Sequence, residues 1–332
     1  MPLQAPQDMP PPRASARILP LMILLGLLLL AAAGAPSARG AQARVPPPQQ
    51  LAPGVYAVVN PHAEPTPENH GGVGNQGILI GDKGVILIDT GTSVRYAGEL
   101  LDTVRQLTSQ PIVLVINTHQ HPAFIFGNGA LASQGVPILA HRATAELIEQ
   151  RCEKCLKNLN DILGAEEMQG TQVVPPTRII DGPTSLKIAG RWLDIVYYGH
   201  SSSPGSIGVI DRNSGVLFAG GLVSIDRVPD TRDARIGTWL RALRALKVRH
   251  VRLMVPGEGA VAPLARIGDL ERYLVALQRT VEKTYQQGVS LGEAGARSDL
   301  PQFKHWSAYS PTHNKNVEQL YLQLEQATFN KQ

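Results

Sequence analysis

Apolar runs and turn residues divide the chain beyond residue 50 into short strands and longer helical segments. Short apolar runs bounded by Gly, Pro, Asp or Asn are typical of buried strands, and apolar residues recurring every three to four positions predict helices. The expected strands are residues 55–58, 77–80, 85–88, 112–116, 137–140, 178–180, 186–188, 193–197, 207–210, 216–218 and 251–255. The expected helices are residues 93–107, 143–163, 238–246, 265–287 and 316–326. Strand-rich segments that alternate with helices predict an α+β fold of packed sheets with helices outside.

The first 43 residues have the pattern of a secretory signal peptide. Arg13 and Arg17 precede an apolar run over residues 18–33, and small residues with an Ala-Gln-Ala pattern follow at 41–43. That order predicts export to the periplasm or the medium, with cleavage after Ala43. The alternative is an uncleaved inner-membrane anchor, because the apolar run is only slightly shorter than a membrane span. We expect no membrane contact beyond this segment.

Beyond the signal peptide, we expect a proline-rich segment over residues 44–54, one domain over 55–290 and a helical extension, 291–332, packed on that domain. The chain has 332 residues and a formal charge of +4, and removal of residues 1–43 brings the charge closer to zero. A nearly neutral chain gives no electrostatic argument for nucleic-acid binding. The expected partner is therefore a small-molecule substrate or another periplasmic protein.

Two histidines follow the most apolar of the expected strands. The segment Asn117-Thr-His-Gln-His121 begins where the strand 112–116 ends, so His119 and His121 are two residues apart in extended backbone. Alternate side chains of a strand point to the same side, and Pro122 favours an extended conformation at His121. His200 follows the strand 193–197 in the same way. Three histidines are a typical ligand set for zinc with an open fourth position.

Five motifs in this order resemble those of the metallo-β-lactamase superfamily: Asp89-Thr-Gly91, Asn117-Thr-His-Gln-His121, Gly199-His200 with Pro204-Gly205, Phe218-Ala-Gly-Gly221 and Val255-Pro-Gly-Glu-Gly259. The resemblance covers residues 51–290. Within the superfamily, the chain most resembles the exported quinoprotein relay system zinc metallohydrolases, through residues 74–77, 127–129 and 151–155. The resemblance implies a four-layer αββα sandwich with a shallow cleft for two metal ions.

The resemblance also implies which residues would hold those metals. The ligand positions of the first metal correspond to His119, His121 and His200, which predicts one Zn²⁺ per chain. The second metal falls to Ala123, Phe124 and Glu258, and the bridging aspartate of the family falls at Gly221. Three of these four positions offer no ligand atom, and the carboxylate of Glu258 cannot hold zinc alone. We therefore expect a degenerate second metal site.

Two functions are consistent with that ligand set. The first is an exported mononuclear zinc hydrolase of an ester, thioester, lactone or amide, in which zinc lowers the pKa of bound water to ~7 and Glu258 serves as general base. The alternative is a catalytically inactive periplasmic binding or accessory protein. It is favoured by Ala123, which replaces the family's nucleophile-orienting carboxylate, and by Phe124, which puts an apolar ring at a metal position.

The only two cysteines, Cys152 and Cys155, lie on one face of the expected helix 143–163. In an exported protein, two cysteines favour a structural disulfide, and two inert thiols are the alternative. A redox role is a third interpretation, although no thioredoxin-like βαβ pattern surrounds the pair. His141, at the start of this helix, is expected to cap it or to support a neighbouring ligand.

Overall fold

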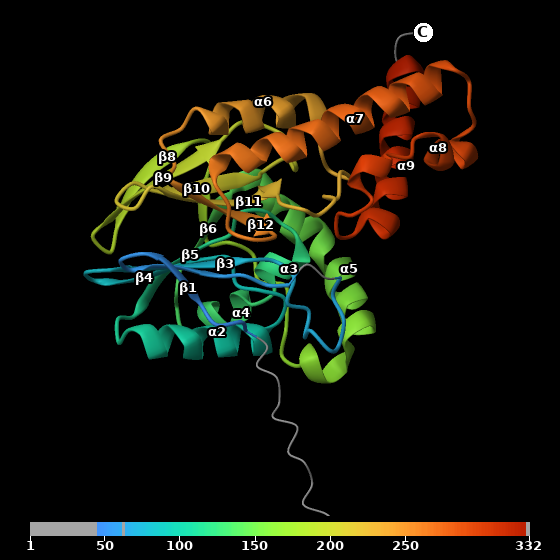
Figure 1. The fold of residues 1–332 in the computed structure, drawn as a ribbon. Helices are drawn as coiled ribbons and strands as arrows, with labels where there is room; N and C mark the ends of the chain where they lie inside the picture. The colour runs from blue at the N-terminus through green and yellow to red at the C-terminus, as the bar shows by residue number, and fades with distance from the viewer. Residues whose placement is uncertain (1–44, 62–63, 330–332) are drawn as a thin grey trace, which may run out of the picture. The chain divides into compact units, whose positions relative to one another are not determined.

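Two β-sheets face one another at the centre of the fold, and helices cover their outer faces (Figure 1). The computed structural model describes residues 45–61 and 64–329, which lie within one unit, residues 43–332. This arrangement confirms the predicted α+β, four-layer αββα sandwich. The predicted signal peptide lies outside the described residues. Within the described part of the chain, no helix is long and apolar enough to cross a membrane.

The first sheet has seven strands in sequence order, antiparallel from β1 to β4 and parallel from β4 to β7. Parallel strands are buried on both faces, which explains the continuous apolar sequence of the fifth strand. The strands are β1 (Gln49–Ala52), β2 (Val55–Val58), β3 (Gln76–Gly81), β4 (Gly84–Ile88), β5 (Ile112–Ile116), β6 (Ile138–His141) and β7 (Arg178–Ile180).

The second sheet has five strands in the order β12-β11-β10-β9-β8, antiparallel except for the parallel pair β11 and β12. It therefore brings the C-terminal ends of β9, β11 and β12 to one edge. The apolar side chains of both sheets form a shared cluster between them that includes Leu79, Ile116, Ile195 and Phe218. The strands are β8 (Thr184–Ile188), β9 (Arg191–Tyr197), β10 (Ile207–Asp211), β11 (Val216–Ser224) and β12 (Leu253–Glu258).

The helices follow from amphipathic patterns with recognisable caps. Ser93 caps α2, because its side chain accepts from the amide of Tyr96, and the apolar face of α2 packs on the first sheet. Helices α6 and α7 pack on the second sheet around Trp239 and Leu274. The helices are α2 (Val94–Leu107), α3 (Pro122–Ile125), α4 (Asn128–Ala132), α5 (Arg142–Glu167), α6 (Ile236–Lys247), α7 (Ile267–Gln286), α8 (Leu291–Arg297) and α9 (Tyr309–Phe329), with 3₁₀ turns η1 (Leu264–Arg266) and η2 (Pro301–Phe303).

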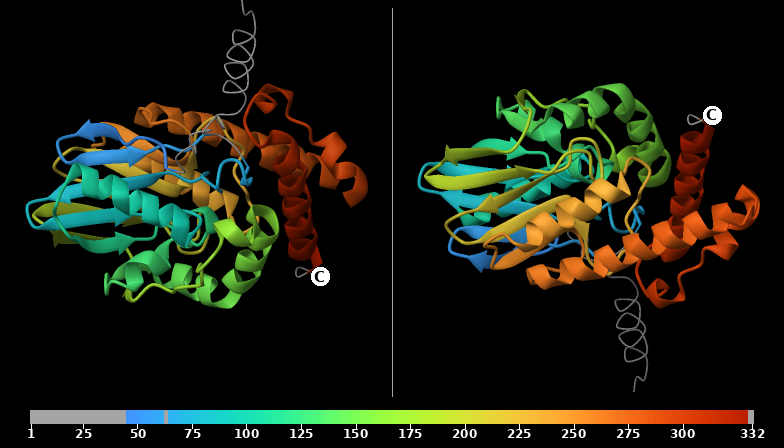
Figure 2. Two further views of the ribbon diagram at one scale, coloured as in Figure 1. Left: turned by 90° about the horizontal axis from the view of Figure 1, so that it is seen from below. Right: turned by 90° about the horizontal axis from the view of Figure 1, so that it is seen from above.

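The C-terminal helices α8 and α9 lie at one end of the sandwich, beyond the end of α7 (Figure 2). Ala294 of α8, Val317 of α9, and Phe303 and Trp306 between the two helices belong to the same cluster as Leu274 of α7. The segment from residue 291 therefore shares the core of the second sheet and its helices. The strand β1 lies within residues 44–54, a segment for which the sequence pattern predicted no strand.

Candidate functional site

The two sheets bring the predicted site residues to one edge of the sandwich. Asp89 and His119 follow the parallel strands β4 and β5, whose C-terminal ends lie at the same edge. His200 follows β9 and Glu258 ends β12, and both strands run in the same direction. The amide of Ile207 donates to the carbonyl of Thr118, which ties the two strand-end regions together. Strand ends of this kind are where α/β scaffolds carry functional groups.

His119 and His121 lie beside one another, as the sequence predicted. Their ring centroids are 6.0 Å apart and their planes differ by 19°. His121 has extended backbone (φ −65°, ψ 136°) and caps α3, because Nδ1 accepts from the amide of Ala123 at 3.4 Å. Burial lowers the pKa of His121 and lowers that of His119 to about 3, so both imidazoles are neutral.

A buried polar relay fixes the ring of His119 from below. The carboxylate of Asp89 accepts from the amide of Thr118 at 2.8 Å and from its hydroxyl at 2.7 Å. The same hydroxyl lies 2.9 Å from Nδ1 of His119, so Nδ1–H donates to it and Nε2 keeps the lone pair. Burial raises the pKa of Asp89 to about 8, against the two hydrogen bonds from Thr118. Asp89 thus acts on the site through Thr118.

An apolar ring occupies the space beside both histidines. The Phe124 centroid is 4.4 Å from that of His119 and 5.8 Å from that of His121, and the side chain is 2% exposed. A Cβ at Gly74 would lie 2.6 Å from Cζ of Phe124, so the ring packs directly on the glycine backbone. Ala123 and Phe124 belong to an apolar cluster with residues of α5. These two positions of the implied second metal are therefore part of the core.

His200 is half-buried, and its hydrogen bond goes to a different loop from those that His119 and His121 contact. Its Nε2 lies 2.6 Å from the carbonyl oxygen of Asp233. The carboxylate of Asp233 also accepts from Arg151 at 2.6 Å and from Gln120 at 3.3 Å. Asp233 therefore links the His200 loop to α5 and to the segment between His119 and His121. The sequence did not predict this role, because no motif or periodic pattern includes Asp233.

Glu258 is engaged by an arginine that the sequence pattern did not single out. Its Oε2 accepts from Nε of Arg227 at 2.7 Å, and Nη2 of Arg227 donates to Glu64 at 2.8 Å. The Arg227 side chain is 8% exposed and that of Glu258 17%. Arg227 lies in the loop three residues after β11, and no motif or period in the sequence marks this contact. The contact competes with the predicted role of Glu258 as general base, because Arg227 already engages Oε2.

The absence of a side chain at Gly221 is also visible in the packing. A Cβ at this position would lie 2.7 Å from Cδ2 of His119 and 2.9 Å from Nε2. The His119 ring thus occupies space that an aspartate at residue 221 would need. Together with Phe124 and the Glu258 ion pair, this shows that the residues present do not fit a second metal.

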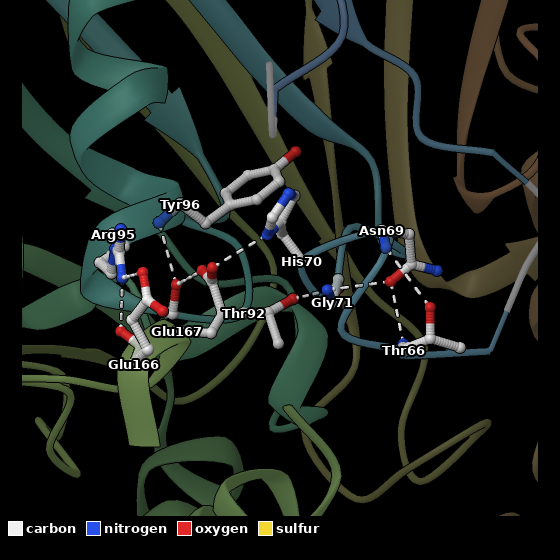
Figure 3. A network of polar contacts seen from close by, with 10 residues as sticks. Thr66, Asn69, His70, Gly71, Thr92, Arg95, Tyr96, Glu166 and Glu167 are labelled. Atoms are coloured by element: carbon white, nitrogen blue, oxygen red, sulfur yellow. Dashed lines mark hydrogen bonds and ion pairs between the residues drawn. The ribbon is translucent and has the colours of Figure 1, made fainter. Parts of the chain in front are cut away.

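The segment over residues 64–75 borders the site and is anchored by a polar network (Figure 3). The side chain of Asn69 accepts from the amides of Thr66 and Gly71. Nδ1 of His70 lies 3.1 Å from Oε2 of Glu167 at the end of α5, and Glu167 also accepts from Ser93 at 2.9 Å. His70 therefore ties this segment to α2 and α5 through Glu167.

His141 and the two cysteines lie at the start of α5 and within it. His141 caps α5, because Nδ1 accepts from the amide of Ala143 at 3.2 Å, and its ring stacks on Tyr197 at 4.0 Å. The cap role is confirmed. Cys152 and Cys155 are separate thiols in the structure, so the expected disulfide is not formed there.

The first ligand set fits one zinc ion by the chemistry of its donors. Within the described part of the chain, each of the three rings has one nitrogen in a hydrogen bond and the other without a partner. The described residues contain no group of three or more His, Cys, Asp or Glu side chains placed to hold a metal ion. His119 and His121 are adjacent, while the hydrogen bond to Asp233 engages His200. Zinc at His119, His121 and His200 therefore stays a prediction.

The chain belongs to the metallo-beta-lactamase superfamily, whose sequence model matches residues 70–258. Two curated proteins named Metallo-beta-lactamase type 2, from Bacillus sp. (strain 170) and Bacillus cereus, are each 25% identical over 189 residues. The matched region is 55% of this chain and 66% of each relative, so the chain spans just under two thirds of their length. The narrower quinoprotein relay subgroup stays a prediction.

Solved structures show the same fold at low identity. A metallo-beta-lactamase from Pontibacter korlensis superposes with a TM-score of 0.57 at 21% identity, over 69% of this chain and 98% of that chain. A double mutant of the sec-alkyl sulfatase PisA1 superposes with a TM-score of 0.65 at 17% identity, over 83% of this chain and 50% of that chain. Likeness at this identity concerns the fold and not the substrate.

Proposed function

We propose that the protein is a hydrolase of its superfamily that works with one zinc ion, held by His119, His121 and His200. The observation that carries this proposal is the pair of neutral imidazoles at the end of β5. Nδ1–H of His119 donates to Thr118 and leaves the Nε2 lone pair open, whereas the lone pair of His121 is on Nδ1, where it accepts from the amide of Ala123 at 3.4 Å. His119 is thus in the form in which histidine binds zinc, with its other ring N–H donated to a protein group, and His121 would bind through Nδ1 by releasing the amide of Ala123.

The chain's own residues prepare and shape this site. Asp89 and Thr118 fix the tautomer and orientation of His119, and the amide of Ala123 orients His121. Phe124 excludes water from one side of both rings. A bound zinc would supply a Lewis acid and a water of pKa near ~7. The third donor would be Nδ1 of His200 while Nε2–H donates to the carbonyl of Asp233, or Nε2 once that contact is exchanged. The role of Glu258 as general base stays a prediction.

The proposed substrate is a small ester, thioester, lactone or amide, because the activated water that a bound zinc would supply is suited to attack on such carbonyl groups. The proposed location is the periplasm or the medium, reached through cleavage after Ala43. Determining the N-terminal residue of protein recovered from the periplasm tests the location. An intact N-terminus in a membrane fraction would instead support the anchor.

The decisive experiment is elemental analysis of the protein purified without a chelator or a histidine tag, followed by loading with zinc. We expect one zinc per chain, lost in His119→Ala and retained in the control His250→Ala, whose histidine is exposed. Turnover of a panel of chromogenic esters, thioesters, lactones and amides should fall with the zinc. Zinc well below one per chain after loading of folded protein would refute the proposal.

A second candidate is a non-catalytic periplasmic binding or accessory protein. The packing of Phe124 on His119, His121 and Gly74 favours it, because an apolar ring stands where the implied second metal would sit. This candidate predicts that His119→Ala leaves the biological role intact in cells at normal protein levels. A phenotype equal to gene deletion, with folded and abundant variant protein, would contradict it.

A further inference from the structure

The two cysteines of α5 differ sharply in their surroundings, although they are only one helical turn apart. Cys152 is 1% exposed and belongs to the apolar cluster that contains Ala123 and Phe124. Its Sγ lies 3.9 Å from the carbonyl oxygen of Gln120, the residue between the two site histidines. Cys155 is half-buried at the edge of the same cluster. One sulfur is therefore accessible to a reagent, and the other lies behind it.

The surroundings also shift the pKa values of the two thiols in opposite directions. A hydrogen bond from the thiol of Cys152 lowers the pKa of Cys155 to about 7, helped by the positive charges of Arg232 and Arg151 and opposed by burial. The same hydrogen bond, burial and the negative charge of Glu153 raise the pKa of Cys152. The thiolate is the nucleophilic form of cysteine. Cys155 is thus suited to attack, and Cys152 to follow it.

Helix geometry argues against a permanent disulfide at this place. Side chains three residues apart on a helix have Cβ atoms about 5–6 Å apart, whereas a disulfide needs about 3.5–4.5 Å. Both cysteines lie inside α5, whose only non-helical backbone angles are at Gly164. Closing the bond therefore distorts the helix, and strained disulfides are readily reduced. A disulfide between residues three apart also closes a very short loop, so it would stabilise the fold little by reducing the entropy of the unfolded chain.

We propose that Cys152 and Cys155 form a redox-active dithiol that exchanges with the disulfide bonds of small molecules. The thiolate of Cys155 attacks one sulfur of the disulfide, the S–S bond breaks, and the departing thiolate takes the electron pair and then a proton. Cys152 gives up its proton and attacks Sγ of Cys155, which releases the second small thiol. The protein dithiol is thereby oxidised to an intramolecular disulfide, and the small-molecule disulfide is reduced to two thiols.

Oxidised glutathione is the probe, applied to the folded, fully reduced protein and followed by intact mass. The wild type should lose the mass of two hydrogen atoms and gain no lasting adduct. Cys152→Ala should accumulate one glutathione on residue 155, because the resolving thiol is gone. Cys155→Ser should react more than tenfold more slowly than Cys152→Ala, because its remaining thiol is buried.

Three results would overturn the proposal. They are a wild type that stays a dithiol in oxidised glutathione, equal reaction rates of the two single variants, and a wild-type disulfide that excess reduced glutathione fails to reopen. Thermal unfolding of both variants provides the folding control. The alanine at residue 152 keeps the site apolar, so the adduct test does not depend on a new buried polar group. None of these readouts depends on zinc or on hydrolysis.

Discussion

Phe124→Ala removes the ring that packs on both site histidines. The resulting loss in the free energy of unfolding measures how much this ring contributes to the core. The ring is 2% exposed and lies 4.4 Å from His119, centroid to centroid. The Gly74 backbone lies against the other side, so collapse of the surroundings into the space is limited. Truncation of a buried phenylalanine costs about 3–5 kcal/mol, which includes the loss of aromatic contacts with the imidazoles. We expect a loss in the free energy of unfolding within that range.

The assay is equilibrium denaturation in urea or guanidinium chloride, read by fluorescence and circular dichroism. Phe329→Ala is the matched control, because the same truncation at a side chain that is 74% exposed should change stability by no more than about 0.5 kcal/mol. An equal effect of the two substitutions would refute the packing described for Phe124. A changed denaturant slope in only one variant would show that its denatured state differs.

Phe124→His tests the same position from the side of metal binding. It replaces an apolar ring next to His119 and His121 with a third imidazole. We expect zinc to bind more tightly than to the wild type, because each added imidazole is a ligand zinc accepts. Calorimetric titration with zinc measures the difference. Unchanged affinity would mean that residue 124 does not face the space between the histidines.

Three further substitutions test the surroundings of the site. In Asp89→Asn the stability change should depend on pH: the pKa of Asp89 is raised from 3.8 to about 8, so its contribution is complete below pH 4 and is lost as the pH rises to 8. Denaturation across this pH range should therefore show a decline in the wild type that is smaller in the variant. Arg227→Met should cost about 3 kcal/mol, because it leaves Glu258 without its ion pair, and Glu258→Met should recover most of that loss in the double variant. Gly221→Ala should cost about 1–3 kcal/mol in denaturation, because its Cβ meets the His119 ring. Gly98→Ala, whose Cβ meets nothing inside helix α2, should instead stabilise by about 0.5–1 kcal/mol through helix propensity.

Much of the fold follows from the sequence because its strands are apolar and its turns are marked. The elements that were missed are short or polar. Helices α3 and α4 have four and five residues, too few for a helical period to be recognised. Helix α9 begins at Tyr309, seven residues before the expected start, because Pro311 is tolerated in a first turn. Strand β1 pairs with β2 although half of its residues are exposed.

The site was predictable only where its residues lie close in sequence. The spacing of His119 and His121 in extended backbone was enough to place their rings together. The partners of Glu258 and His200 come from the segment between β11 and α6, and no period or motif connects them. Such contacts depend on how two sheet edges meet in space. For the same reason, the sequence showed that Phe124 is no ligand but not that its ring packs on Gly74.

His119 and His121 also have structural roles that do not require a metal. His119 fills the space above Gly221 and is hydrogen-bonded to the buried Thr118. His121 caps α3 through the amide of Ala123. Removing either one therefore costs packing or a helix cap, whether or not zinc binds. Their presence in the sequence is consequently equally expected of a zinc hydrolase and of a binding protein on the same fold. Zinc content together with the Phe124 variants separates these two functions, because only the hydrolase requires the histidines to share one ion.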